Sequence, residues 1–221
     1  MKAMILAAGC GTRLAPLTEA MPKPMIPIAS EPLIVHQLRW LHRAGIRDVV
    51  INLHHLGEQI QSHIGRGGDF GVRVQYSVEE ELLETGGGIR KALPMLGPEP
   101  FLVLNGDVWT NFPFRTLCDV APDLAHLVLT PTPAGQAGDF RLDGDSVRRD
   151  ADVSDTHDLT FCGIAVLHEA IFNDAPSGPF SMRDLYFRAA AKGRLQGERF
   201  DGLWVDIGTH DQLRRVRRIN L

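Results

Sequence analysis

Residues 6–28, LAAGCGTRLAPLTEAMPKPMIPI, carry the most informative pattern in the chain. The apolar run at residues 4–8 predicts a buried strand, which leads directly into the glycine-rich segment Gly9-Cys10-Gly11-Thr12-Arg13. Glycines after a strand let backbone N–H groups approach an anion, because no Cβ stands in the way. Arg13 supplies one cation, and Lys23, between two prolines, supplies a second. A backbone nest with two cations predicts a polyphosphate site, since that charge is spread over several oxygens.

Two better-known phosphate loops do not fit this segment. The P-loop needs four residues between its glycines and then Gly-Lys-Ser/Thr, an order that the segment lacks. The dinucleotide fingerprint needs a third glycine where this chain has Leu14. A bare Gly-x-Gly is as often a tight turn as a binding loop, so the prediction depends on the longer pattern.

Composition and charge exclude several function classes. With 221 residues the chain can bury roughly 70% of its unfolded surface, and one domain over residues 1–221 is expected. A net charge of −4, with both signs dispersed, gives no basic field for nucleic acid. No apolar run approaches the ~20 residues of a membrane span, and the early core strand leaves no room for a signal peptide. Three scattered cysteines fit a reducing cytoplasm better than a disulfide framework or a zinc site.

Strand-like and helix-like segments alternate along the chain. Expected strands are residues 48–53, 72–77, 101–104, 124–130 and 159–167; expected helices are 34–44, 56–64, 182–191 and one from about 211. This alternation predicts an α/β fold, a Rossmann-like doubly wound mixed sheet with helices on both faces. The polar, glycine-rich stretch at 134–158 predicts a small β excursion beside that sheet.

Two aspartates stand where a metal ion is expected. Asp107 ends the most apolar strand in LNGDV, and Asp206 follows a short apolar run in WVDIGT. Either one alone could be a turn residue. However, ligands of such sheets bind beyond the carboxyl ends of the strands. Magnesium on a polyphosphate needs only one or two protein carboxylates, so this pair facing the glycine loop predicts an Mg²⁺ site.

Two further segments allow two interpretations each. Glu84–Ile89 (ETGGGI) places three glycines at a helix entrance, which is costly in ordering entropy. It is either a flexible loop or a backbone that a flat base or sugar ring approaches closely. Asp139, in GDFRL, is either a solvated turn residue or an acceptor for a sugar hydroxyl or amide.

The pattern Gly-x-Gly-Thr-Arg-Leu-x-Pro-Leu-Thr, followed by Pro-Lys-Pro-Met-x-Pro-Ile, resembles the signature of the sugar-phosphate nucleotidyltransferases. The resemblance runs from Met1 to about Thr209. It implies a nucleotidyltransferase (GT-A-like) fold in which residues 1–110 bind the nucleotide and residues 111–221 the sugar. The implied substrates are a nucleoside triphosphate, with UTP favoured, and a sugar 1-phosphate, with Mg²⁺ as cofactor.

The resemblance also implies roles for individual residues. It implies that the phosphates are bound by Gly9, Gly11, Thr12, Arg13 and Lys23, of which Arg13 and Lys23 are the catalytic cations. It implies that magnesium is bound by Asp107 and Asp206. Nucleobase recognition falls to main-chain groups around Glu84 and Gly86, and to Glu79, whose carboxylate could accept from uracil N3–H. Sugar binding falls to Asn105, Asp139 and Thr160.

Charge considerations then predict a mechanism without a general base. A sugar 1-phosphate is already ionised at neutral pH, so the obstacle is repulsion between two anions, which Mg²⁺, Arg13 and Lys23 reduce. No catalytic histidine, serine or cysteine is therefore expected.

Several points stay open at the level of sequence. Many relatives carry a Glu-Lys-Pro element after the region of Asp139, and this chain has none, so the sugar is not decided. Guanylyl- and thymidylyltransferases remain alternatives to a uridylyltransferase, and a non-catalytic sugar-nucleotide sensor is the rival class. A sugar that carries its own carboxylate would need a further cation, for which Arg90 and Arg141 are candidates. A monomer is favoured, with no nucleic-acid or membrane partner.

Overall fold

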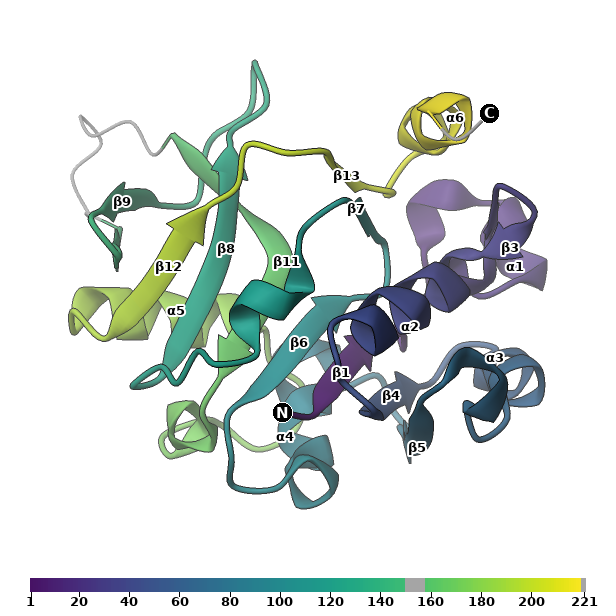
Figure 1. Ribbon diagram of the computed structural model, residues 1–221, viewed down its shortest axis with the longest axis horizontal. Helices are drawn as coiled ribbons and strands as arrows, with labels where there is room; N and C mark the ends of the chain where they lie inside the picture. Colours follow the sequence, from purple (N-terminus) through teal and green to yellow (C-terminus); the bar gives the residue numbers. More distant parts are fainter. Residues whose placement is uncertain (150–157, 220–221) are drawn as a thin grey trace.

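A nine-stranded mixed sheet forms the centre of the protein in the computed structural model, which describes residues 1–149 and 158–219 (Figure 1). The sheet order is β5-β4-β1-β6-β11-β8-β12-β10-β9. The strands are β1 (Ala3–Leu6), β4 (Asp48–Leu53), β5 (Arg73–Val78), β6 (Phe101–Asn105), β8 (Ala125–Pro131), β9 (Arg141–Asp143), β10 (Ser146–Arg148), β11 (Leu159–Leu167) and β12 (Leu195–Arg199). Strands β5, β4, β1 and β6 are parallel, whereas β11 runs antiparallel to both β6 and β8. The predicted mixed α/β sheet is thus confirmed.

Helices cover both faces of this sheet, because successive residues of each strand point to opposite sides. On one face α2 (Leu33–Arg43) and α3 (Gly57–Ile64) bury apolar side chains against Ile5 and Ile51. On the other face α4 (Glu84–Leu96) and α5 (Met182–Ala191) pack against Met4 and Val50. Figure 1 shows α2 in front of the sheet and α4 and α5 behind it.

A third apolar cluster joins the two ends of the chain. It contains Leu14, Ile26, Trp109, Val205 and Leu213. The short elements of this part of the protein are η1 (Thr12–Leu14), α1 (Leu17–Ala20), η2 (Lys23–Met25), β2 (Pro27–Ile28), β3 (Glu31–Pro32) and the C-terminal helix α6 (His210–Ile219). Strand β7 (Val108–Thr110) pairs antiparallel with β13 (Trp204–Asp206) beside it, with Asp206 opposite Val108. Residues about a hundred positions apart are therefore brought to one point.

The second half of the sheet departs from expectation in one respect. Strands β9 and β10 form a hairpin, and β10 pairs with β12 at the edge of the main sheet. The predicted β excursion is therefore part of the main sheet, because backbone pairing with β12 continues the ladder. Residues 150–157 of the same stretch lie outside the described residues. No helix in the described residues combines the length and apolarity needed to cross a bilayer.

The three glycines at the start of α4 are required by packing against other parts of the protein. A Cβ built on Gly86 would lie 2.2 Å from a ring carbon of Phe180, and one on Gly87 would lie 2.5 Å from the Gly178 carbonyl oxygen. A Cβ on Gly88 would lie 2.6 Å from Glu79 Oε1. The space of each missing side chain is thus filled by the protein itself, which explains the glycines without a flexible loop and without a base or sugar ring.

Substituting Gly86→Ala should therefore destabilise the fold, because the added methyl group meets an aromatic ring and backbone that cannot both withdraw. We expect a loss of roughly 1–3 kcal/mol in the free energy of unfolding, measured in urea. Gly68→Ala is the matched control, since its Cβ has no neighbour within 4 Å and it should change stability by about 0.5 kcal/mol or less. Equal effects of the two substitutions would contradict this packing role.

Candidate active site

The glycine loop and the cations around it line a cavity of about 260 Å³ at the carboxyl ends of β1 and β6. The lining side chains and backbone come from Gly9, Gly11, Thr12, Arg13, Lys23, Asp107 and Gly208, among others. Gly11 has φ of 63°, a left-handed conformation that favours glycine, and its carbonyl accepts from the Thr18 hydroxyl at 2.9 Å. The structure thus brings the predicted phosphate-binding residues together in one cavity.

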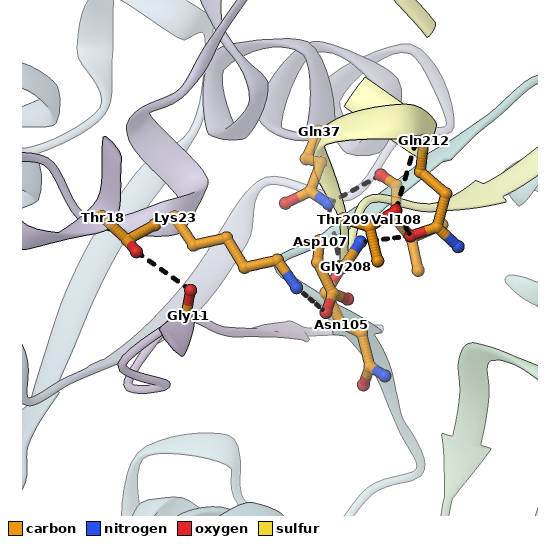
Figure 2. Close-up of polar contacts among 10 residues, drawn as sticks. All are labelled: Gly11, Thr18, Lys23, Gln37, Asn105, Asp107, Val108, Gly208, Thr209 and Gln212. Carbon is orange, nitrogen blue, oxygen red and sulfur yellow. Dashed lines mark hydrogen bonds and ion pairs between the residues drawn. The ribbon is translucent and has the colours of Figure 1, made fainter. Parts of the chain in front are cut away.

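Lys23 is the central cation of this cavity. Its ammonium lies 2.5 Å from Asp107 Oδ2, and its side chain is only 12% exposed (Figure 2). Limited contact with water strengthens the interaction of this charge with any anion in the cavity. Lys23 is therefore placed between the glycine loop and the acidic residues, as the sequence predicted.

Asp206 reaches the same point from β13. The Ile207 N–H donates to the Asp107 carbonyl at 2.9 Å, which ties the two segments together. Burial, followed by the negative charge of Asp107, raises the pKa of Asp206 to about 6. Its Oδ1 is buried and has no hydrogen-bond partner among the described residues. The two predicted aspartates therefore share one site and repel one another there.

This acidic pair fits a divalent cation. A buried carboxylate oxygen without a partner is costly, and a cation shared with the neighbouring carboxylate would satisfy it. Within residues 1–149 and 158–219, no cluster of three or more His, Cys, Asp and Glu side chains could hold a metal unaided. Asp107 and Asp206 would hold Mg²⁺, whose remaining positions are commonly taken by water and phosphate oxygens.

Gly208 is a member of the site that the sequence analysis did not single out. A Cβ on Gly208 would lie 2.8 Å from Arg13 Nη2, so the guanidinium of Arg13 packs directly on this backbone. The Gly208 N–H donates to Gln212 Oε1 at 2.9 Å (Figure 2). The only signal in the sequence was the glycine that follows Asp206 in WVDIGT. The absence of a side chain there allows Arg13 to lie across the end of β13.

Gln37 was also missed, although it holds the turn that carries Asp107. It is fully buried in α2, and its Nε2 donates to the carbonyls of Asn105 at 2.9 Å and Val108 at 3.1 Å (Figure 2). Its Oε1 has no hydrogen-bond partner among the described residues. A glutamine on the apolar face of a helix was the signal available in the sequence. The amide of Gln37 thus restrains the backbone on either side of Asp107.

A second cavity of about 360 Å³ adjoins the first and lies at the entrance to α4. It is lined by Gly9, Asn52, Glu84, Asn105 and Asp107, among others. Glu84 has φ of 58°, an uncommon conformation for a residue with a side chain. Glu84 therefore lines a cavity that is open beside the glycine loop, and its role toward a nucleobase stays a prediction.

Glu79, by contrast, lies beneath this cavity and does not line it. It is 3% exposed, its Oε1 accepts from Asn52 Nδ2 at 2.7 Å, and its Oε2 accepts from the Leu83 N–H at 3.0 Å. The expectation that Glu79 accepts from a base is corrected, because both carboxylate oxygens hold the protein's own groups. Gly86 is likewise engaged, since its N–H donates to the Phe180 carbonyl at 2.8 Å.

A third cavity of about 220 Å³ continues from the second on the side of α5. Asn105 lines both cavities, and Asp139 lines the third, where its Oδ2 accepts from the Phe161 N–H at 3.0 Å. Thr160 is not among the lining residues; its hydroxyl pairs with that of Thr132 at 3.1 Å. Since Phe161 lines the cavity, its neighbour in β11 faces the other side of the sheet, which corrects the expectation for Thr160.

The two candidates for a further cation lie outside the third cavity. Arg90 donates to the carbonyls of Ala175 and Pro176, and neither it nor Arg141, on β9, lines the third cavity. Arg183 of α5 lines it instead. Among the arginines of the described residues, Arg183 is thus a cation in the lining of this cavity that the sequence pattern did not mark.

Comparisons with known proteins give this chain its family. Residues 2–140 match the family model described as nucleotidyl transferase. The chain is 40% identical to an N-acetylmuramate alpha-1-phosphate uridylyltransferase of Neisseria meningitidis, over 99% of this chain and 98% of that one. It is 33% identical to a protein of the same name from Caulobacter vibrioides, over 93% and 91% of the two chains. A mannose-1-phosphate guanyltransferase of Aspergillus oryzae is 31% identical over 94% of this chain but only 61% of its own length.

The fold has solved counterparts. A putative glucose-1-phosphate thymidylyltransferase from Bacillus anthracis superimposes with a TM-score of 0.86, covering 100% of this chain and 95% of the other at 24% identity. HddC from Yersinia pseudotuberculosis, crystallised with GMP-PN, superimposes with a TM-score of 0.82 at 22% identity, covering 99% and 98% of the two chains. At these identities the likeness concerns the fold.

The burial of Asp206 beside a second carboxylate should be visible in stability. Because the pKa of Asp206 is raised from 3.8 to about 6, protonation stabilises the folded protein at low pH, and this contribution is lost as the pH rises through 6. Without magnesium, Asp206→Asn should therefore raise the free energy of unfolding at pH 7.5 by on the order of 2 kcal/mol, and by less at pH 5. Urea titrations in EDTA at both pH values measure this difference.

The control for this experiment is Asp201→Asn, which removes an exposed carboxylate that pairs with Arg199. It should leave stability nearly unchanged at either pH, because exposed pairs contribute little. A loss of stability in Asp206→Asn at pH 7.5 would show that the ionised, buried carboxylate does not oppose folding.

Proposed function

Because this chain belongs to the nucleotidyl transferase family, we propose that it is a magnesium-dependent N-acetylmuramate α-1-phosphate uridylyltransferase. The observation that carries the proposal is the convergence of Arg13, Lys23 and two aspartates on the glycine loop. The uridylyl relatives, which match over nearly the whole of both chains, support the choice of substrates. UDP-N-acetylmuramate and pyrophosphate are the products.

The proposed reaction is a direct transfer. An oxygen of the sugar 1-phosphate forms a bond to the α-phosphorus of UTP, while the bond from that phosphorus to the bridging oxygen breaks and pyrophosphate leaves. The attacking oxygen is already anionic, so no side chain has to remove a proton. When bound, Mg²⁺ supplies charge neutralisation and holds phosphate oxygens in place.

The chain's own contribution is electrostatic. Lys23 and Arg13 place two positive charges beside the glycine loop, where they reduce the repulsion between the two anions and stabilise charge on the departing pyrophosphate. The N–H groups of the loop add fixed dipoles. Asn105, at the junction of the second and third cavities, is placed to contact the sugar, and Asp139 to accept from one of its groups.

Lys23 is the residue whose loss should affect turnover most. Lys23→Met should lower kcat by about 10²–10³-fold, since it removes a charge aimed at the transferred group. His55→Gln should retain activity, although its ring contacts the Thr18 carbonyl beside the loop at 3.0 Å. Pyrophosphate release measures both variants, and circular dichroism verifies that each folds. An inactive His55→Gln beside an active Lys23→Met would refute a mechanism without a general base.

A substrate panel tests the proposed specificity. Pyrophosphate release is measured for four nucleoside triphosphates with the 1-phosphates of N-acetylmuramate, N-acetylglucosamine, glucose and mannose, each with magnesium and with EDTA. We expect the highest kcat/KM for UTP with N-acetylmuramate 1-phosphate, and no release in EDTA. Preference for GTP with mannose 1-phosphate would favour a guanylyltransferase. No release with any pair would favour a sugar-nucleotide sensor.

A further inference from the structure

The third cavity has a cation in its wall that the reaction at the phosphates does not use. Arg183 lies in the first turn of α5 and lines this cavity together with Asn105 and Asp139. Its guanidinium carbon is 5.3 Å from the ring centroid of Phe187, which lines the cavity as well. The helix therefore presents a positive charge resting on an aromatic ring at the sugar side of the site.

The ring beneath this charge is held from two other directions. Phe187 meets Phe140 edge to face, with centroids 5.6 Å apart. The guanidinium carbon of Arg149 lies 4.0 Å from its centroid, and Arg149 Nη1 donates to the Asp139 carbonyl at 2.5 Å. Phe187 is thus a fixed support on which two guanidinium groups gather, so this side of the cavity is electropositive.

A guanidinium that lies over an aromatic ring is suited to binding a carboxylate. The cation–π contact takes up none of the N–H donors as a hydrogen bond, and these donors form a fork that matches two carboxylate oxygens. In the described part of the chain, no carboxylate forms an ion pair with Arg183. A negative group on a ligand in the third cavity would find this fork available.

We propose that Arg183 binds a carboxylate carried by the sugar itself. In the proposed substrate this group is the carboxylate of the lactyl ether, so the inference rests on the proposed function and deepens it. The sugar phosphate lies toward Lys23, and Asn105 marks the passage between the two cavities. The sugar's second negative charge then lies toward α5, away from the acidic pair.

The rest of the cavity wall favours this orientation. Asp139 would repel a carboxylate but accept from a hydroxyl or an amide N–H, so Asp139 and Arg183 select different groups of the sugar. Phe161, Met182 and Tyr186 add apolar surface to the lining of this cavity, which suits the methyl groups of the acetamide and the lactyl ether. Arg183 is therefore a specificity-determining residue for a sugar with an acidic substituent.

The test compares two sugar phosphates that differ only in the lactyl ether, N-acetylmuramate 1-phosphate and N-acetylglucosamine 1-phosphate. Arg183→Gln should lower kcat/KM for the former about 10- to 100-fold, mainly through KM, because a charge-assisted pair is lost. It should leave the latter unchanged, measured as a competitive Ki if turnover is too slow. Arg183→Lys should fall between, since an ammonium keeps the charge without the fork.

Arg188→Ala is the matched control, because Arg188 lies on the same helix, donates to the Asp174 carbonyl and does not line this cavity. It should leave both sugar phosphates unaffected. If the wild type uses N-acetylmuramate 1-phosphate but Arg183→Gln changes neither substrate, or both equally, the inference fails while the proposed function stands. If the wild type does not use N-acetylmuramate 1-phosphate with UTP, the proposed function itself fails, and the inference with it.

Discussion

The burial of Asp206 beside a second carboxylate, that of Asp107, is the constraint on which the rest of the site depends. An ionised carboxylate that is buried next to another one opposes folding, and the pKa of Asp206 is raised first by this burial and then by the charge of Asp107. The surrounding structure has to hold them together in spite of it. Lys23 balances the charge of Asp107, with 2.5 Å between its Nζ and Asp107 Oδ2, and Arg13 lies across the backbone of Gly208.

Apolar packing supplies the restraint. The third cluster, which joins Leu14 and Trp109 to Val205 and Leu213, holds the β7–β13 pair against the glycine loop and α6. Gln37 then restrains the turn before β7 through two hydrogen bonds to backbone carbonyls. Its unpaired Oε1 lowers the stability of the fold, so the side chain is better explained by the position it gives to Asp107 than by its contribution to the core.

The three connected cavities divide recognition by chemistry. The first is lined by cations and glycine backbone, the second by the strained start of α4, and the third by aromatic side chains with Asp139 and Arg183. A polyphosphate site has to exclude mobile water and to balance the negative charge of the phosphates, whereas a sugar site needs apolar surface and a few oriented polar groups. The order of the cavities along the sheet edge therefore matches the order of groups in the proposed substrates.

The sequence by itself determined the mixed α/β fold, the glycine loop with Arg13 and Lys23, and the two aspartates. These follow from periodicity and from residue types whose chemistry allows few alternatives. Only the tertiary structure decided the roles of Gly86, Glu79 and Thr160, because those depend on partners distant in sequence or on the face of a strand. Phe180 occupies the space where a side chain of residue 86 would lie, and the Glu79 carboxylate accepts hydrogen bonds from Asn52 and Leu83. Arg183 acquires significance only where α5 meets Phe187 and the cavity, a contact that no local pattern encodes.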